Sequence, residues 1–178
     1  MVRRVLVWRG LDEWTAESAE VTLEGDRLRA RGVQIGADPS GYRLTYELDT
    51  AERYVTTRLS VRADGDGWSR SLELRRNQEG EWRADGEPVD LDLAGALDCD
   101  LALSPLTNFM PIKRDAGGPE DYVMAWVSVP DLQVHRSEQR YEPIADGRVR
   151  FSSPGFSADL DLDDDGFVAY YPGIAERL

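Results

Sequence analysis

Short runs in which apolar and polar residues alternate fill most of the chain and predict β-strands. In the run 54–63, Leu59 and Val61 alternate with Arg58 and Arg62, so one face is apolar and the other is polar. Glycine turns such as Gly25-Asp26 separate successive runs. The predicted strands span residues 2–8, 17–24, 27–35, 42–48, 54–63, 68–75, 122–129, 132–144, 148–152, 156–162 and 167–171. This pattern indicates an all-β protein.

The number and spacing of these strands indicate their arrangement. Loops this short join antiparallel neighbours, because parallel strands need long crossovers. A dozen or so strands in one sheet generally curl or close, and a large curled sheet can enclose a cavity. We therefore expect a single domain over residues 1–178: a large curled, mostly antiparallel sheet forming a partial barrel or roll with an internal cavity. The only helical turns expected are short ones, at 91–97 or 118–122.

One predicted strand differs from the others. The segment 122–129 is apolar on both faces, with Tyr122, Met124 and Trp126 on one side and Val123 and Ala125 on the other. A strand of this kind needs cover on both sides. We expect it to lie between the core and the wall of a cavity.

The segment 98–114 begins as a strand and then breaks. Residues 97, 99, 101 and 103 form its apolar face, and Asp98 and Asp100 lie on the other. Ser104-Pro105 imposes a turn, since proline fixes its own φ and restricts the residue before it. Pro111 then stiffens the exit toward Lys113-Arg114. The pattern predicts a rigid loop at the end of a strand.

Composition narrows the choice of partners. The net charge of −13 argues against binding to nucleic acid or to an anionic membrane, because neutralising phosphates requires clustered cations. Cys99 is the single cysteine and lies on an apolar strand face, so we expect a buried, inert thiol and no internal disulfide. No run approaches the length of a membrane span. The expectation is a soluble, cytoplasmic protein with no integral membrane segment; the oligomeric state stays open.

Motifs for catalysis or metal binding are weak. Residues 161–166 match the first half of an EF-hand loop, but Pro172 stands where a glutamate is needed, so an acidic hairpin turn is the favoured interpretation. His135 is the only histidine, and Ser104 lacks the glycine-rich surroundings of a nucleophile elbow. We expect no catalytic residue, no metal and no cofactor.

Several motifs carry a resemblance. The run 104–114, Ser-Pro-Leu-Thr-Asn-Phe-Met-Pro-Ile-Lys-Arg, with Asp98-Cys99-Asp100-Leu101 before it, resembles the bacterial putative glycolipid-binding family. Trp8-Arg9-Gly10, Ala125-Trp126-Val127, 129–132 and Gln139-Arg140-Tyr141 also resemble that family, so the likeness extends over nearly the whole chain. Phe109-Met110 and Lys113 depart from its pattern. The resemblance implies a curled β-fold similar to periplasmic carriers of lipoproteins, and binding of a glycolipid or another amphiphile.

The leading hypothesis is a non-enzymatic protein that holds an amphiphile in its cavity. Thr107 and Asn108 would bond polar head-group atoms, and Lys113 and Arg114 would meet an anionic group or carbonyls. An equally weighted reading makes them structural, with Arg114 paired to Asp98 or Asp100. The candidate ligand-binding residues are Thr107, Asn108, Pro111, Lys113, Arg114 and Trp126. The alternatives are a hydrolase acting on a lipid-like ester or glycoside, and a structural or interaction protein whose core is filled by Trp126, Met124 and Phe109.

Overall fold

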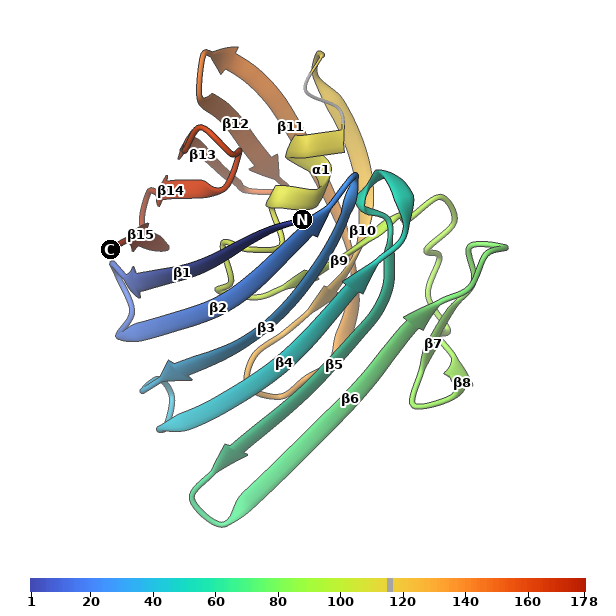
Figure 1. Ribbon diagram of the computed structural model, residues 1–178. Coiled ribbons are helices and arrows are strands. Elements are labelled where there is room, and N and C mark those ends of the chain that lie inside the picture. The colour runs from blue at the N-terminus through green and yellow to red at the C-terminus, as the bar shows by residue number, and fades with distance from the viewer. Residues whose placement is uncertain (115–116) are drawn as a thin grey trace.

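The computed structural model describes residues 1–114 and 117–178, and its strands form one continuous sheet (Figure 1). Within these residues the sheet has 15 strands in the order β8-β7-β6-β5-β4-β3-β2-β1-β15-β14-β13-β12-β11-β10-β9. Every pair is antiparallel except β9 with β10, which run parallel. The sheet is not closed into a barrel, because its edge strands β8 and β9 do not pair with each other.

Apart from the short strands β7, β8 and β15, which were not predicted, the strands agree with the predicted runs in order and approximate bounds. They are β1 (Val2–Gly10), β2 (Thr15–Glu24), β3 (Arg27–Gly36), β4 (Tyr42–Thr50), β5 (Thr56–Gly65), β6 (Trp68–Arg76), β7 (Trp82–Ala84), β8 (Glu87–Pro88), β9 (Asp98–Leu101), β10 (Glu120–Val127), β11 (Val134–Ala145), β12 (Arg148–Ser153), β13 (Phe156–Leu162), β14 (Val168–Tyr171) and β15 (Ala175–Arg177). The predicted all-β, curled and mostly antiparallel fold is confirmed.

The sheet curls until its β9 end lies against β5. In Figure 1 the β9–β11 end passes behind the β3–β5 part, and β9 contacts β5. The Thr56 amide donates to the Leu97 carbonyl at 3.0 Å, and the Cys99 amide donates to the Thr56 hydroxyl at 3.1 Å. These bonds fasten β9 across the start of β5. The two ends of the chain also come together in the sheet, because β1 pairs with the short strand β15, which the hydrophobic pattern did not predict.

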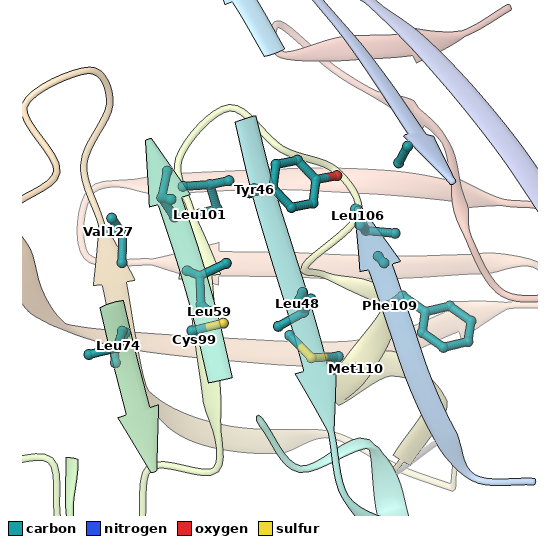
Figure 2. Close-up of a cluster of buried hydrophobic side chains, with 14 of the residues drawn as sticks. Tyr46, Leu48, Leu59, Leu74, Cys99, Leu101, Leu106, Phe109, Met110 and Val127 are labelled. Atoms are coloured by element: carbon teal, nitrogen blue, oxygen red, sulfur yellow. The ribbon is translucent and has the colours of Figure 1, made fainter. Parts of the chain in front are cut away.

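Side chains fill the centre of the roll. Figure 2 shows Phe109, Met110 and Leu106 packed among residues of the sheet, and all three are 0% exposed. Phe109 stacks on Phe167 with ring centroids 4.1 Å apart. A ligand cavity must therefore lie at the margin of this core and not in its middle.

Strand β10 is covered on both faces, as its composition predicts. Val127 and Ala125 pack in the larger core cluster, on the side of β4–β6. Met124 packs in a second cluster with Tyr141 and Phe151 of β11 and β12. Two cores thus lie on the two sides of β10, and the helix α1 (Phe109–Arg114) contributes Phe109 and Met110 to the larger one and Ile112 to the other.

The helices differ from the prediction. The expected loop after Pro105 contains the helix α1, and neither 91–97 nor 118–122 is helical. Pro111 fits because it sits in the first turn, where its missing N–H is not needed, and four of the six helical residues are buried. A short 3-10 helix, η1 (Glu52–Tyr54), precedes β5. No helix in the described ranges has the length and apolar character to cross a membrane.

Candidate functional site

A cleft of about 310 Å³ lies beside the loop that connects β9 to α1. It combines polar groups with aromatic rings, and residues of β9–β12 and of the turns around β13–β15 surround it. Its lining consists of Asp100, Leu101, Ala102, Leu103, Ser104, Asn108, Trp126, Ser137, Gln139, Phe151, Ser153, Phe156, Tyr171 and Ile174. Two of the predicted ligand-binding residues, Asn108 and Trp126, are among them.

Strand register brings the lining together. Asp100 is the neighbour of Trp126 in the parallel β9–β10 pair, so the two side chains leave the sheet on the same face. Ser137 and Gln139 of β11 pair with Met124 and Tyr122 of β10, two and four residues from Trp126, and share that face by the alternation of side chains along a strand. These side chains are therefore held in place by sheet hydrogen bonds, and the loop after β9 adds Ser104 and Asn108 to the lining.

Hydrogen bonds organise the polar floor. The Thr107 hydroxyl donates to Asp100 Oδ1 at 2.8 Å, and Gln139 Nε2 donates to Asp100 Oδ2 at 2.6 Å. The hydroxyl oxygen of Tyr141 lies 3.0 Å from both Asn108 Oδ1 and Gln139 Oε1. Loss of solvent raises the pKa of the Asp100 carboxyl group, although the bonds from Gln139 and Thr107 oppose the rise. The floor is a connected and acceptor-rich network.

Aromatic side chains form the other boundary. Phe156 lies between Phe151 and Tyr171, with ring centroids 6.0 and 6.3 Å away, and 41% of it is exposed. The Trp126 ring is half-buried, and its centroid lies 5.2 Å from that of His135. The cleft thus opens to solvent past apolar rings. A group bound there would have an apolar surface on one side and hydrogen-bonding atoms on the other.

A buried carboxyl group connects to this floor through Ser104. Glu17 Oε1 accepts hydrogen bonds from the Ser104 hydroxyl at 2.7 Å and from the Tyr46 hydroxyl at 2.5 Å. Its other oxygen, Oε2, has no partner among the described residues. Burial raises the pKa of Glu17 to about 7, against the lowering effect of the two hydrogen bonds. Glu17 therefore titrates near neutral pH while it holds the loop below the cleft.

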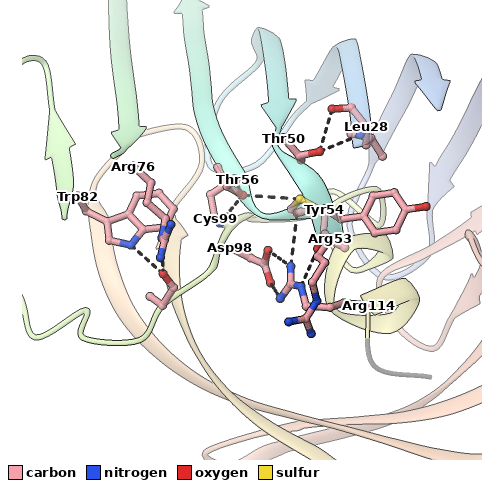
Figure 3. A network of polar contacts seen from close by, with 12 residues as sticks. Leu28, Thr50, Arg53, Tyr54, Thr56, Arg76, Trp82, Asp98, Cys99 and Arg114 are labelled. Atoms are coloured by element: carbon pink, nitrogen blue, oxygen red, sulfur yellow. Dashed lines mark hydrogen bonds and ion pairs between the residues drawn. The ribbon is translucent and has the colours of Figure 1, made fainter. Parts of the chain in front are cut away.

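Arg114 lies away from the cleft. Figure 3 shows its guanidinium group facing the Asp98 carboxylate, in an ion pair whose side chains are 1% and 0% exposed. Arg114 Nη1 donates to Asp98 Oδ2 at 2.8 Å, and Nε donates to the Arg53 carbonyl at 2.8 Å. These contacts match the structural reading in which Arg114 pairs with Asp98. They attach the end of α1 to β9 and to η1.

The other predicted residues take different positions. Lys113 donates to the Asp165 carbonyl at 2.9 Å on the surface. Pro111 lines a separate hollow of about 280 Å³, next to Tyr122 and Tyr141. Thr107 is buried and touches the cleft through Asp100. The structure brings Asn108 and Trp126 to one cleft, with Thr107 behind it, and a ligand-binding role for all six residues stays a prediction.

The weak motifs find structural explanations. Asp161, Asp163 and Asp165 pair with Arg148, Arg177 and Arg4, in the hairpin between β13 and β14. No cluster of potential metal ligands occurs in residues 1–114 and 117–178. Cys99 is fully buried, and burial raises its pKa to about 12, as expected for an inert thiol.

Sequence reasoning missed several lining residues. Asp100 was assigned to the polar face of its strand but not to the site, although a carboxylate beside a doubly covered strand is a usable signal. Gln139 belongs to a run that resembles the family, but the sequence alone gives it no role, nor does it show that Tyr141 of the same run bonds Gln139 beneath the cleft. Phe156 and Tyr171 are distant in sequence and carry no local signal, because only the curl of the sheet brings them to the cleft.

An open, curled single sheet with a cleft of mixed polarity places the chain among β-rolls, a class whose sheets can enclose ligand sites. The chain belongs to the putative glycolipid-binding family, whose sequence model matches residues 5–177, so the predicted family is confirmed. A crystal structure of a DUF1089 family protein from Pseudomonas aeruginosa is similar, with a TM-score of 0.77 and 25% identity over 96% of this chain and 95% of that chain. No curated protein matches the sequence.

Proposed function

We propose that the protein is a non-enzymatic carrier or sensor that binds an amphiphile, with the head group on the Asp100–Gln139 floor of the cleft. The observation that carries this proposal is the mixed lining: half-buried Asp100 and buried Asn108 and Gln139 line the same cleft as the rings of Trp126 and Phe156. A small-molecule site needs a few fixed polar groups within apolar surroundings. Family membership supports binding of a lipid-like ligand at this coarse level.

The ligand chain would leave past the exposed ring of Phe156. The cleft volume of about 310 Å³ suits a head group and the first part of a chain, at the lower end of typical ligand sites. The centre of the roll offers no further room, since Phe109 and Met110 fill it. We therefore place the ligand in the cleft beside the core and expect much of an alkyl chain to stay outside the described pocket.

The alternative is a structural or interaction protein whose core is filled by side chains. It gains support from Phe109 and Met124, which are 0% and 1% exposed. Trp126 differs, because it lines the cleft and is half-buried. A purely structural protein would bind no amphiphile at this cleft. The binding experiment below separates the two possibilities.

The hydrolase alternative would use Ser104, whose hydroxyl donates to Glu17. The pKa of Glu17, raised to about 7, suits a general base, yet Ser104 is only 3% exposed. Turnover of a chromogenic ester that falls in Ser104→Ala and Glu17→Gln would favour this alternative. Saturable binding without turnover supports the carrier.

The test of the proposal is a titration with octyl β-glucoside below its critical micelle concentration, followed by calorimetry and tryptophan fluorescence. We expect saturable binding at one site per chain, with a fluorescence change that is lost in Trp126→Phe. Trp14→Phe is the matched control, because Trp14 is 67% exposed and lies outside the cleft lining. Absence of saturable binding, or the same response in Trp126→Phe as in the wild type, would refute the proposal.

A further inference from the structure

We propose that Glu17 is a positioning residue for the cleft, and that its proton controls whether the segment 102–104 is closed against the sheet. This segment is part of the cleft lining. Glu17 is not among the lining residues and would act through Ser104, which is. The inference rests on the proposed function, because it concerns the regulation of the same cleft.

Two hydrogen bonds tie the segment 102–104 to the inner face of β2 and β3. The Ser104 hydroxyl donates to Glu17 Oε1 at 2.7 Å, and Gln34 Nε2 donates to the Ala102 carbonyl at 3.2 Å. Glu17 and Gln34 are neighbours in the β2–β3 pair, so both ties start from adjacent points on one face. On its other side the segment is tied to β10, because the Ala102 amide donates to the Val127 carbonyl at 2.9 Å. Glu17 therefore supplies a tie that closes the segment against β2.

Two tyrosines of β4 hold the side chains that make these ties. A Cβ on Gly32 would collide with the Tyr46 ring, so this glycine lets the ring lie across β3 while its hydroxyl donates to Glu17 Oε1 at 2.5 Å. The Tyr42 hydroxyl donates to Gln34 Oε1 at 3.1 Å. Burial raises the pKa of both phenols, so both stay protonated donors through the neutral range. The sheet thus fixes the position of the carboxyl group.

The surroundings of Glu17 favour its neutral form while the segment is closed. Its neighbours on β1 and β3 are the uncharged Trp8 and Gln34. In the described part of the chain no arginine, lysine or histidine bonds the carboxyl group, and Oε2 is buried without a partner. Glu13, which acts on Tyr42 together with Glu17, is a further acid. A buried carboxylate with an unpartnered oxygen is costly, whereas the neutral group keeps an oxygen that can accept both bonds.

The backbone of the segment favours its release. Leu103 has a φ of +61°, in the left-handed region that leucine rarely adopts, and the ties at Ala102 and Ser104 flank it. Opening of the segment would relax Leu103 and let water reach Glu17 Oε2. Ionised Glu17 therefore favours the open segment, and protonated Glu17 favours the closed one.

Native-state hydrogen exchange, measured by NMR at pH 5.5 and pH 8, tests the proposal without a ligand. The probe is the Ser104 amide, which donates to the Leu101 carbonyl at 3.1 Å; dividing its exchange rate by the intrinsic rate gives the opening constant. The pKa of Glu17 is about 7 in the closed form and 4.5 for a solvated carboxyl group, so the opening constant should rise at least about tenfold between the two pH values. The Asp85 amide, in the turn between β7 and β8, is the internal control and should not change.

Three variants separate the proton from the shape of the side chain. Glu17→Gln keeps an oxygen for Ser104 but does not ionise, so its opening constant should be the same at both pH values and close to that of the wild type at pH 5.5. Ser104→Ala removes the tie and should raise the opening constant at pH 5.5. Glu20→Gln is the matched control, because Glu20 lies on the exposed face of the same strand and pairs with Arg31. It should keep the pH dependence of the wild type.

Three results of the exchange experiment would overturn the proposal. The first is an opening constant of the wild type that does not change with pH. The second is the same rise in Glu17→Gln as in the wild type. The third is exchange of the Ser104 amide with the same opening constant as an amide in the middle of the sheet, such as that of Tyr46, because the opening would then be global unfolding.

A binding experiment links the segment to the cleft and keeps the two proposals apart. Octyl β-glucoside should bind the wild type more weakly at pH 8 than at pH 5.5, and Glu17→Gln equally at both. Absence of binding at either pH would overturn the proposed function, while hydrogen exchange would still decide whether the proton of Glu17 closes the segment. Binding that ignores pH, in a protein whose segment opens with pH, would overturn the role of Glu17 in positioning the cleft.

Discussion

Replacement of Arg114 by methionine distinguishes a structural arginine from one that recognises a ligand. Arg114 and Asp98 are 1% and 0% exposed, and the guanidinium group also bonds the carbonyls of Arg53 and Tyr54. In Arg114→Met the Asp98 carboxylate would stay buried without its cation. Breaking a buried ion pair in this way costs about 3–5 kcal/mol. That is a large part of the roughly 5–15 kcal/mol that stabilises a folded domain.

The assay is urea unfolding at neutral pH, followed by circular dichroism and tryptophan fluorescence. With a urea dependence of about 2–3 kcal/mol per M, the midpoint should fall by about 1–2.5 M. The double variant Asp98→Asn, Arg114→Met should be more stable than Arg114→Met alone, because it leaves no unpaired buried charge. The matched control is Arg140→Met, whose ion pair with Asp121 is exposed and should contribute less than about 1 kcal/mol.

A loss of less than about 1 kcal/mol in Arg114→Met would refute this reasoning, because such a value is typical of exposed pairs. The reasoning would also be refuted if adding Asp98→Asn to Arg114→Met lowered the stability further, by as much as Asp98→Asn alone lowers that of the wild type. Unchanged stability together with loss of amphiphile binding would instead support a ligand-binding role for Arg114.

Three further predictions concern the buried core. The pKa of Glu17 is raised from 4.5 to about 7, so the folded state binds the extra proton. The contribution of Glu17 to stability should be fully present below pH 4.5 and fall by about 3 kcal/mol as pH rises to 7, and Glu17→Gln should remove this part of the pH dependence in urea unfolding. Phe109→Ala should cost about 3–5 kcal/mol, since the ring is 0% exposed and stacks on Phe167, whereas a cost below about 1 kcal/mol would show a loosely packed centre. A maleimide should label Cys99 only at the rate of unfolding, because the thiol is fully buried, and rapid labelling of the native protein would contradict the packing.

The hydrophobic alternation was sufficient to predict the long strands and the class of fold. Residues 27–32 of β3 and 58–63 of β5 have one apolar and one polar face, so local sequence determines these strands. The short strand β15 has three residues and owes its existence to pairing with β1, a contact between the two ends of the chain. The helix α1 was missed because two prolines near it indicate a loop, while burial of Phe109 and Met110 stabilises a helical turn.

The candidate site was predicted only where it coincides with a local signal. Asn108 lies in a distinctive loop, and Trp126 lies in a doubly apolar strand, so both could be selected from the sequence. The same logic selected Arg114 and Lys113, because adjacent cations after a loop suit an anion. Their partners, Asp98 and the Asp165 carbonyl, depend on how α1 docks against β9 and on the β13–β14 turn, and periodicity does not report such contacts.

The most direct test of amphiphile binding in the cleft is an NMR titration that follows the five tryptophan indole N–H resonances as octyl β-glucoside is added. Trp8 and Trp82 provide internal controls, because their indole groups donate to the carbonyls of Val168 and Ala96 in the core. We predict a saturable shift of the Trp126 indole together with the side-chain amides of Asn108 and Gln139, while Trp8 and Trp82 stay unchanged. Shifts that are absent, do not saturate, or leave Trp126 unaffected would contradict the account.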